Sequence, residues 1–269
     1  MPPSPKILVR GSGDVASAVA HLLFRCGYAV LMHESPQPGA TRRKMAFTDA
    51  VFDGSAWLEG LESRRIDDLP GLLAAFDAHQ FIPLTVAGFA WILKEVSPAV
   101  LVDARMRKHS QPEAQLGLAR LTLGLGPGFV AAQTVDIAIE TGRGPDLGRV
   151  IRSGAAAPLT GEPVSLAGHA RERYVYAPVA GVFRTALQIA DPVRQGQVVA
   201  RIGDQPLLAP LDGVLRGLTR DGVPVEAGFK VVEVDPRGSA AQVSGIGERP
   251  AKIAQGVLTA LQTYLPNKG

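Results

Sequence analysis

Apolar residues in the first part of the chain form short continuous runs that alternate with stretches of helical spacing. The run over 6–10 is typical of a strand buried on both faces. Small apolar residues recur at helical spacing over 15–23, and Gly27 is placed to end that helix. The run over 28–32 predicts a second strand. Further helices and strands are predicted over 71–79, 81–85, 89–96 and 99–103. This alternation indicates an α/β domain built on a parallel sheet.

The pattern changes near Arg171, where helical spacing stops and short β segments begin. The segment 177–184 is echoed by 209–216, 32 residues later. Self-similarity of this kind predicts two equivalent β units packed together. Residues 250–264 then have the spacing of a closing amphipathic helix.

These changes divide the chain into three expected parts. Residues 1–170 form a ligand-binding domain, in which 38–65 is an insertion of short strands. Residues 171–238 form a β-rich module, and residues 239–269 form a C-terminal helical segment.

The composition is that of a soluble globular protein, with 46% hydrophobic and 20% charged residues. A net charge of +3 gives no reason to expect nucleic acid as a partner. No apolar run approaches the roughly 20 residues that span a bilayer, so no membrane association is expected. The single cysteine, Cys26, supports neither a disulfide nor a cysteine-based zinc site, and no metal site is predicted. The N-terminal residues lack the features of a signal peptide, which favours a cytoplasmic location.

The turn after the first strand carries the clearest chemistry. Residues 11–16 have the form G-x-G-x-x-A, in which Gly11 permits the tight turn and Gly13 lets the backbone approach a pyrophosphate. The helix N-terminus that follows offers N–H groups to phosphate. Glu34 follows at the distance expected of an acid that bonds a ribose hydroxyl. We therefore predict a Rossmann-like sheet with a site formed by Gly11, Ser12, Gly13, Asp14, Val15, Ala16 and Glu34.

Asp14 is unusual in such a turn, since a carboxylate there would repel a pyrophosphate. Two interpretations stay open. Asp14 starts the helix and points aside, or it binds a ligand hydroxyl, amine or metal. NAD(P) is therefore a less favoured occupant than the glycine motif alone indicates.

Three further groups extend the predicted site. A basic cluster soon after Glu34 is placed to clamp a second phosphate. A second group follows the carboxyl end of the 99–103 strand, where α/β sheets gather ligands. A third is another glycine turn with two arginines after it. Each group also has a plain interpretation as a polar loop or hairpin. The groups are Arg42 with Arg43, Asp103 with Arg105 and Lys108, and Gly126 with Gly128, Arg143 and Arg149.

The repeated segments resemble the halves of the biotinyl/lipoyl barrel-sandwich hybrid, which share an A-P-x-x-G pattern. Those carriers modify a lysine on the hairpin between the halves. The corresponding residues here, 201–208, contain no lysine, so the resemblance implies a scaffold, docking surface or lid. The expected fold class is therefore α/β, with a Rossmann-like parallel sheet followed by a barrel-sandwich-hybrid-like module.

Motifs over nearly the whole chain point to a family. They are the segments 10–17, 37–43, 47–54, 101–105, 126–129, 140–149 and 235–238. Together they resemble the YqeB family, named as an accessory protein of the selenium-dependent molybdenum hydroxylase system. The glycine turn is also similar to the nucleotide-fold half of XdhC-type proteins, which help insert molybdenum cofactor into xanthine dehydrogenase. Pro145 stands where the YqeB family usually has histidine, so no acid–base role is expected there.

Three functions follow as alternatives. The resemblance implies a maturation factor for a molybdenum hydroxylase, which would bind a molybdopterin-type cofactor or a nucleotide and contact the hydroxylase. The glycine turn with Glu34 would suit an NAD(P)-dependent oxidoreductase, although no Tyr-x-x-x-Lys pair stands out. The β-rich module would suit a non-catalytic adaptor. The expected partners are a phosphate-bearing small molecule and a molybdenum hydroxylase. The sequence leaves open whether the protein catalyses a reaction and what its oligomeric state is.

Overall fold

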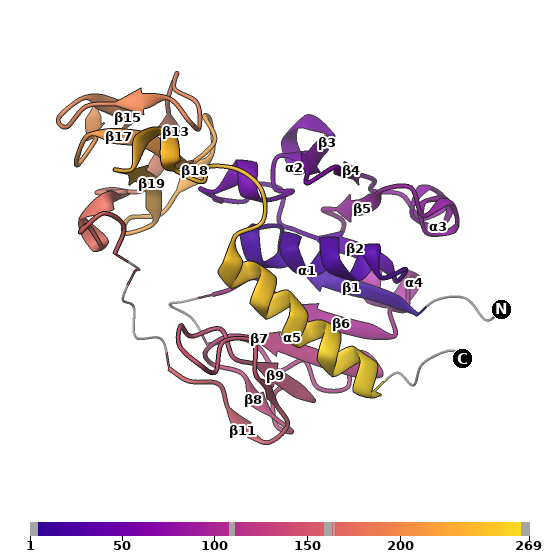
Figure 1. Ribbon diagram of the computed structural model, residues 1–269. Coiled ribbons are helices and arrows are strands. Elements are labelled where there is room, and N and C mark those ends of the chain that lie inside the picture. Colours follow the sequence, from indigo (N-terminus) through magenta and orange to yellow (C-terminus); the bar gives the residue numbers. More distant parts are fainter. Residues whose placement is uncertain (1–4, 108–110, 159–162, 164, 265–269) are drawn as a thin grey trace.

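The computed structural model describes residues 5–107, 111–158, 163 and 165–264. Its largest element is a sheet of nine strands in the order β10-β9-β7-β6-β1-β2-β5-β4-β3 (Figure 1). The seven strands from β9 to β4 in this order run parallel to their neighbours. The strands are β1 (Lys6–Arg10), β2 (Ala29–His33), β3 (Ser55–Leu58), β4 (Leu61–Arg65), β5 (Ile82–Thr85), β6 (Val100–Asp103), β7 (Leu121–Leu125), β9 (Ile137–Ile139) and β10 (Val150–Ile151).

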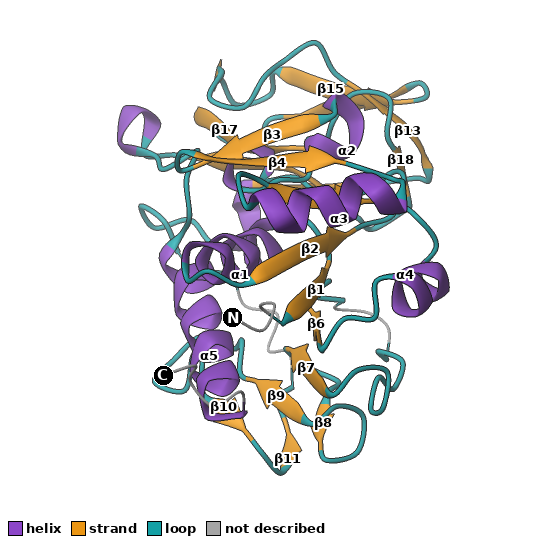
Figure 2. Ribbon diagram, turned by 90° about the vertical axis from the view of Figure 1, so that its right-hand side faces the viewer, coloured by secondary structure: helices purple, strands orange, loops and turns teal. Residues whose placement is uncertain are grey.

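Helices cover both faces of this sheet. On one face α5 (Glu248–Tyr264) packs along α1 (Asp14–Arg25), and the buried side chains of both join one apolar core with β1 and β2 (Figure 1). On the other face α3 (Leu69–Ala78) and α4 (Phe89–Glu95) cover a second core (Figure 2). The described part of the chain contains no helix that is both long and apolar enough to cross a membrane.

A glycine contact fixes α5 against the loop before β10. A Cβ built on Gly256, in α5, would lie 2.1 Å from the carbonyl oxygen of Gly148. A Cβ built on Gly148 would in turn lie 2.5 Å from the carbonyl oxygen of Lys252. The absence of side chains at both positions therefore allows the helix and the loop backbones to touch.

The expected fold class is wrong, because the large sheet is mixed and three antiparallel sheets accompany it. At one edge β3 and β4 pair antiparallel. Glu59 and Gly60, which join them, both have positive φ (45° and 73°), and a two-residue turn of this kind returns the chain antiparallel. At the other edge β10 pairs antiparallel with β9. Residues 46–57, expected as a short strand, instead contain α2 (Ala50–Asp53) and reach β3 only at their end.

The C-terminal strands form two four-stranded antiparallel sheets, in the orders β12-β19-β17-β14 and β16-β15-β13-β18. Their bounds are β12 (Tyr174–Tyr176), β13 (Gly181–Arg184), β14 (Pro192–Val193), β15 (Val198–Ile202), β16 (Gln205–Leu208), β17 (Gly213–Leu218), β18 (Pro224–Val225) and β19 (Lys230–Asp235). We call residues 174–235 the C-terminal module. Its core is a separate apolar cluster that includes Phe183, Leu215 and Val234.

The sequence repeat corresponds to two halves that exchange strands. Gly181 and Gly213 begin β13 and β17, and both have nearly extended φ values of 159° and 157°. The short strand β14 of the first half pairs with β17 of the second, while β18 of the second half pairs with β13 of the first. Each sheet is therefore completed by an edge strand from the other half.

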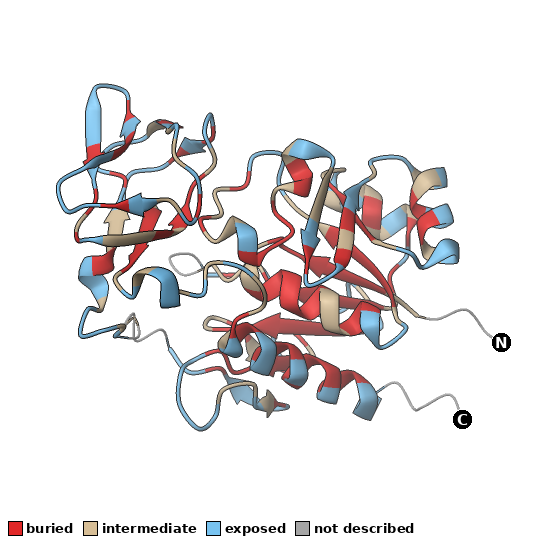
Figure 3. Cartoon of the chain, turned by 45° about the horizontal axis from the view of Figure 1, so that its top comes forward, coloured by how far each residue is buried: buried red, intermediate tan, exposed pale blue. Residues whose placement is uncertain are grey.

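The remaining elements are short. Figure 3 shows that buried residues concentrate in the central strands and on the inner sides of the two long helices. The short elements are η1 (Arg43–Met45), β8 (Val130–Ala131), β11 (Gly154–Ala155), η2 (Arg171–Arg173) and η3 (Gly238–Ala240), and β8 pairs with β11 in a two-stranded sheet.

Candidate functional site

A row of polar side chains crosses the large sheet at the carboxyl ends of its central strands. Arg10, the last residue of β1, is in register with His33 of β2 and with Asp103 of β6. Each of the three follows a leucine of its own strand by two residues, so its side chain points to the same face of the sheet as that leucine. The leucines are Leu8, Leu31 and Leu101, and they belong to the second core, which α4 covers. The row therefore lies on the α4 face, at the edge where parallel sheets bind ligands.

Arg10 is buried at the centre of this row. Its side chain is 7% exposed, and its Cζ lies 3.7 Å from the centre of the Phe89 ring. Its Nη1 donates to Glu113 Oε1 at 3.5 Å and lies 3.9 Å from Asp103 Oδ2. Its Nε is buried without a hydrogen-bond partner among the described residues. Burial, and then the charge of Arg105, lower the pKa of Arg10 from its ordinary value.

Two more arginines converge on the same carboxylate. Arg105 Nη2 donates to Glu113 Oε1 at 3.0 Å, and Arg107 Nη2 donates to Glu113 Oε2. Arg105 also donates from Nε and Nη2 to the two oxygens of Asp103, which is 1% exposed. We call Arg10, Arg105, Arg107, Asp103 and Glu113 the arginine site.

The pKa of Glu113 reflects this convergence. Burial alone would raise the pKa, but hydrogen bonds from its own backbone and from Arg107 and Arg105 lower it to about 2. For Arg105, burial acts to lower the pKa, but the hydrogen bonds to Asp103 and Glu113 and the charges of these carboxylates together raise the pKa above its ordinary value. Glu113 and Arg105 are therefore charged at neutral pH.

His33 closes one side of the arginine site. Its ring stacks on Phe89, the first residue of α4, with ring centres 5.7 Å apart. Burial, and then the positive charge of Arg10, lower the pKa of His33 to about 4. His33 is therefore neutral at pH 7 and adds no charge to the arginines beside it.

The segment that carries Glu113 is held at both sides. Gln111 Nε2 donates to the carbonyl oxygen of Gly128 at 2.8 Å, and a Cβ on Gly128 would lie 2.6 Å from Pro112. Gln115 donates from its backbone N–H to Thr134 at 2.7 Å and from its side chain to Asp103. The second glycine turn thus supports the segment that reaches into the arginine site.

The first glycine turn lies beside the arginine site, and its Ser12 is already bonded to Glu34. Ser12 donates to Glu34 Oε2 from its backbone N–H at 2.8 Å and from its hydroxyl at 2.9 Å. The other oxygen of Glu34 accepts from the N–H and hydroxyl of Ser35. Gly11 has a φ of 104°, and a Cβ there would meet the backbone of Ala104 at 3.1 Å. Glu34 therefore binds the turn itself.

Asp14 links the first helix to the C-terminal module through Arg42. Its Oδ1 accepts from the N–H of Val15, and its Oδ2 accepts from Arg42 Nη1 at 3.1 Å. Burial alone would raise the pKa of Asp14, but Arg42, Lys230 and Arg249 outweigh it and lower the pKa. Asp14 thus lies at the start of α1 with Arg42 as its partner, and ligand binding by Asp14 stays a prediction.

The predicted basic cluster contacts the C-terminal module. Arg42 Nε and Nη2 donate to the two oxygens of Glu233 at 3.0 and 3.1 Å. Arg43 Nε donates to the carbonyl oxygen of Leu218, and Lys44 Nζ donates to that of Ile189. We call the contact made by Arg42, Arg43 and Lys44 the module seam. Among the described residues, no hydrogen bond or ion pair joins Arg42 or Arg43 to the arginine site.

The other predicted residues are scattered. Gly126 has a φ of 96°, and a Cβ there would meet Thr141 Oγ1 at 2.8 Å. Arg143 is exposed, and Arg149 pairs with Asp146 at 3.4 Å. Gly13, Val15 and Ala16 form the start of α1. Lys108 lies outside the described residues, and ligand binding by all of these residues stays a prediction.

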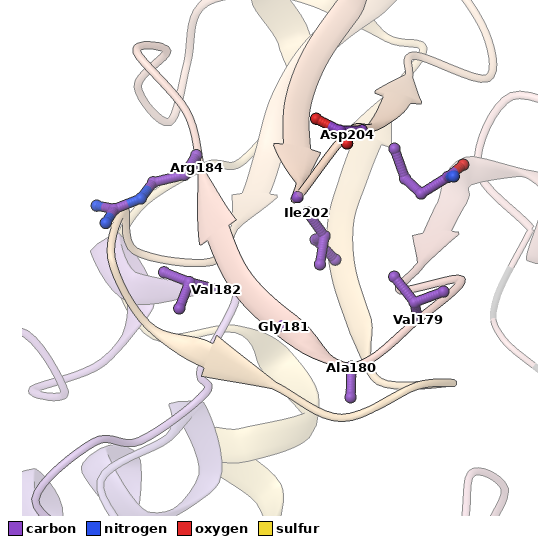
Figure 4. A pocket seen from close by; sticks show the side chains of 9 residues that line it. Val179, Ala180, Gly181, Val182, Arg184, Ile202 and Asp204 are labelled. Atoms are coloured by element: carbon purple, nitrogen blue, oxygen red, sulfur yellow. The ribbon is translucent and has the colours of Figure 1, made fainter.

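A surface pocket of about 600 Å³ lies on the C-terminal module (Figure 4). Val179, Val182 and Ile202 supply its apolar side, and Arg184 and Asp204 supply charge. It adjoins the turn between β15 and β16, which corresponds to the hairpin that carries lysine in the biotinyl/lipoyl carriers. No set of three or more metal-ligating side chains occurs anywhere among the described residues.

Sequence reasoning missed the side chains that make the arginine site distinctive. Arg10 was assigned only to the first strand, although a charged residue that ends a buried strand just before a glycine turn is a usable signal. Glu113 gives no signal, because it lies in a polar stretch without periodicity.

Comparisons with known proteins complete the description. No protein-family model matches the sequence. The product-bound ectoine utilization protein EutE (DoeB) from Ruegeria pomeroyi is 13% identical, covering 86% of this chain and 85% of that chain, with a TM-score of 0.26. A succinylglutamate desuccinylase from Silicibacter sp. TM1040 is 10% identical, with coverages of 86% and 85% and a TM-score of 0.26. A succinylglutamate desuccinylase/aspartoacylase from Rhodobacter sphaeroides is 12% identical, with coverages of 86% and a TM-score of 0.25.

These structures correct the expected function. They are named as ectoine utilization and desuccinylase or aspartoacylase family proteins, and none of these names refers to molybdenum hydroxylase maturation. That function is not retained, and neither are the oxidoreductase and adaptor alternatives. With TM-scores near one quarter, these structures transfer neither their fold nor an activity to this chain.

The curated protein "Uncharacterized protein YqeB" of Escherichia coli (strain K12) is 38% identical to this chain over 259 residues. The match covers 96% of this chain and 48% of that protein, so the chain spans about half the length of this relative. A selenium-dependent role is not confirmed by it. Over almost its whole length the chain is therefore similar to about half of YqeB, which supports the family resemblance seen in its motifs.

Proposed function

We propose that this chain binds a phosphate-bearing small molecule at the arginine site. The state of Arg10 carries the proposal. Its guanidinium is buried, yet its Nε has no partner among the described residues, and a buried unsatisfied donor costs about 1–3 kcal/mol. An oxyanion bound between Arg10 and Arg105 would satisfy this donor.

The chemistry and position of the arginine site support the same ligand class. Arg105 already binds Asp103 through two nitrogens, the fork geometry that arginine also offers to phosphate. The site lies outside the carboxyl ends of β1 and β6, between two adjacent parallel strands. Ligands of open α/β sheets bind at such strand ends.

This proposal moves the phosphate away from residues 11–16. The N–H of Ser12 is occupied by Glu34, whereas the arginine site retains an unsatisfied donor. A nucleotide and a molybdopterin-type cofactor, the two ligands expected from the sequence, both carry a phosphate that would suit the site. We propose the phosphate as the recognised group and leave the remainder of the ligand to experiment.

Calorimetric titration of the full chain with ATP, AMP and pyrophosphate tests the proposal. We expect at least one to bind, with at least a tenfold loss of affinity in Arg10→Met, which keeps the length of the side chain and removes its donors. Arg64→Met is the matched control, because Arg64 is half-exposed on β4 and also stacks on a phenyl ring. Circular dichroism establishes that both variants fold. Absence of binding at millimolar ligand, or equal binding by Arg10→Met, would refute the proposal.

A further inference from the structure

We infer that the arginine site takes a terminal phosphate in its dianionic form, and that this phosphate displaces the carboxylate of Glu113. The inference rests on the proposed function, because it concerns the same site. It adds the charge state of the recognised group and the internal anion with which that group competes.

Glu113 already occupies the position of an oxyanion. Its Oε1 accepts from Arg105 at 3.0 Å and from Arg10 at 3.5 Å, and its Oε2 accepts from Arg107. Its side chain is nevertheless 51% exposed, whereas that of Asp103 is 2% exposed. The Glu113 carboxylate is therefore the outer anion of the cluster, and Asp103 is the inner one.

The backbone around Glu113 allows its side chain to leave alone. The segment is held on one side by the bond from Gln111 to Gly128 and on the other by the bonds from Gln115 to Thr134 and Asp103. Rotation of the Glu113 side chain into solvent breaks none of these. When a phosphate displaces Glu113, the arginines therefore exchange their bonds to the carboxylate for bonds to the phosphate. The backbone of residues 111–115 stays in place.

The charge balance selects a dianion. Three guanidinium groups face two carboxylates, which leaves one net positive charge while Glu113 is in place. Without Glu113 the site has two net positive charges. A carboxylate ligand would merely repeat the Glu113 contact, whereas a phosphate monoester carries about −1.5 to −2 at pH 7 and neutralises the site.

The pH dependence follows from the groups that face the site; among the described residues these are Arg10, His33, Asp103, Arg105, Arg107 and Glu113. Carboxylates and guanidinium groups do not ordinarily titrate between pH 5.5 and 7.5. The low pKa of His33, about 4, keeps that ring neutral over the same range. The second ionisation of a phosphate monoester falls near about pH 6, so binding should weaken as the pH falls through that value.

The experiment compares methyl phosphate, dimethyl phosphate and acetate by NMR titration of the full chain at pH 7.5. We expect methyl phosphate to bind at least tenfold more tightly than dimethyl phosphate or acetate, and to weaken severalfold at pH 5.5. Glu113→Gln should bind methyl phosphate about tenfold more tightly than the wild type. Glu95→Gln, which alters a surface pair with Lys94, should bind it as the wild type does.

The outcomes separate the two proposals. If neither the wild type nor Glu113→Gln binds methyl phosphate, the proposed function fails together with the inference. If the wild type binds it in a manner sensitive to Arg10→Met, but Glu113→Gln binds no more tightly, displacement of Glu113 is refuted alone. Equal affinity for dimethyl phosphate or acetate refutes selection of a dianion.

Discussion

Replacement of Glu233 by glutamine should strongly destabilise the protein. The Glu233 side chain is fully buried and accepts hydrogen bonds from Arg42, Arg173, Arg216 and Lys230 at distances from 3.0 to 3.3 Å. In Glu233→Gln these four cations face a neutral amide, and three of them are half-buried or buried arginines. Removal of one partner from a buried ion pair costs about 3–5 kcal/mol, so we expect a loss of about that size.

The same carboxylate predicts a pH dependence. Burial alone would raise the pKa of Glu233, but Lys230, Arg42 and Arg216 outweigh it and hold the pKa far below its ordinary value. A depressed carboxylate pKa adds stability above the unfolded-state value, about 4.3, and that stability is lost as the pH falls through the folded-state value. The stability of the wild type should therefore fall faster than that of Glu233→Gln below about pH 4.

Urea denaturation followed by circular dichroism measures both effects. Glu226→Gln is the control, since Glu226 is exposed on the same module and forms no ion pair among the described residues. A free energy of unfolding for Glu233→Gln within about 0.5 kcal/mol of the control, the scale of ordinary surface changes, would refute the reasoning. That result would show that the four cations can lie at this position without the negative charge of Glu233.

Three further results are expected. Gly256→Ala should lower the free energy of unfolding by about 1–3 kcal/mol, because its Cβ would overlap the Gly148 carbonyl. Gly88→Ala should cost less, because no described atom lies within 4 Å of a Cβ there and only the N-cap preference for glycine at the start of α4 is lost; equal melting temperatures would contradict this. Ser12→Ala removes a hydroxyl bond to Glu34 and should cost about 1.5–3 kcal/mol by urea denaturation, an expectation that an unchanged midpoint would rule out. The His33 ring should titrate by NMR near about pH 4; because its folded-state pKa is below the ordinary value, the stability it contributes is present above about pH 6.5 and is lost as the pH falls. A midpoint near pH 6.5 would show that the ring is not buried beside Arg10.

Local pattern predicted the elements whose two faces are both buried. A strand was predicted from the 6–10 run, a turn from the glycine motif, and a close-packed helix from the small residues of α1. Each of these elements depends on residues that are neighbours in the sequence. The direction of β3 was missed, since it depends on two positive φ values at Glu59 and Gly60. An edge hairpin of this kind changes the class of a sheet without changing its apolar pattern.

The candidate site was predicted in part for a related reason. Asp103 and Arg105 were placed at the site because they follow a strand end, which is a local feature. Arg10 and Glu113 meet across more than one hundred residues, and no spacing rule brings them together. Glu233 alternates with apolar residues in β19 as a solvent-facing residue would, yet the module seam buries it.

The exchange of edge strands in the C-terminal module has a consequence for how it can be built. Since β14 pairs with β17 and β18 pairs with β13, neither repeat has a complete sheet of its own. During synthesis, the first repeat therefore emerges from the ribosome with an unpaired strand edge. The pairing is completed only after the second repeat has emerged. Duplication of such a repeat would yield a stable unit only in pairs, whether within one chain or between two.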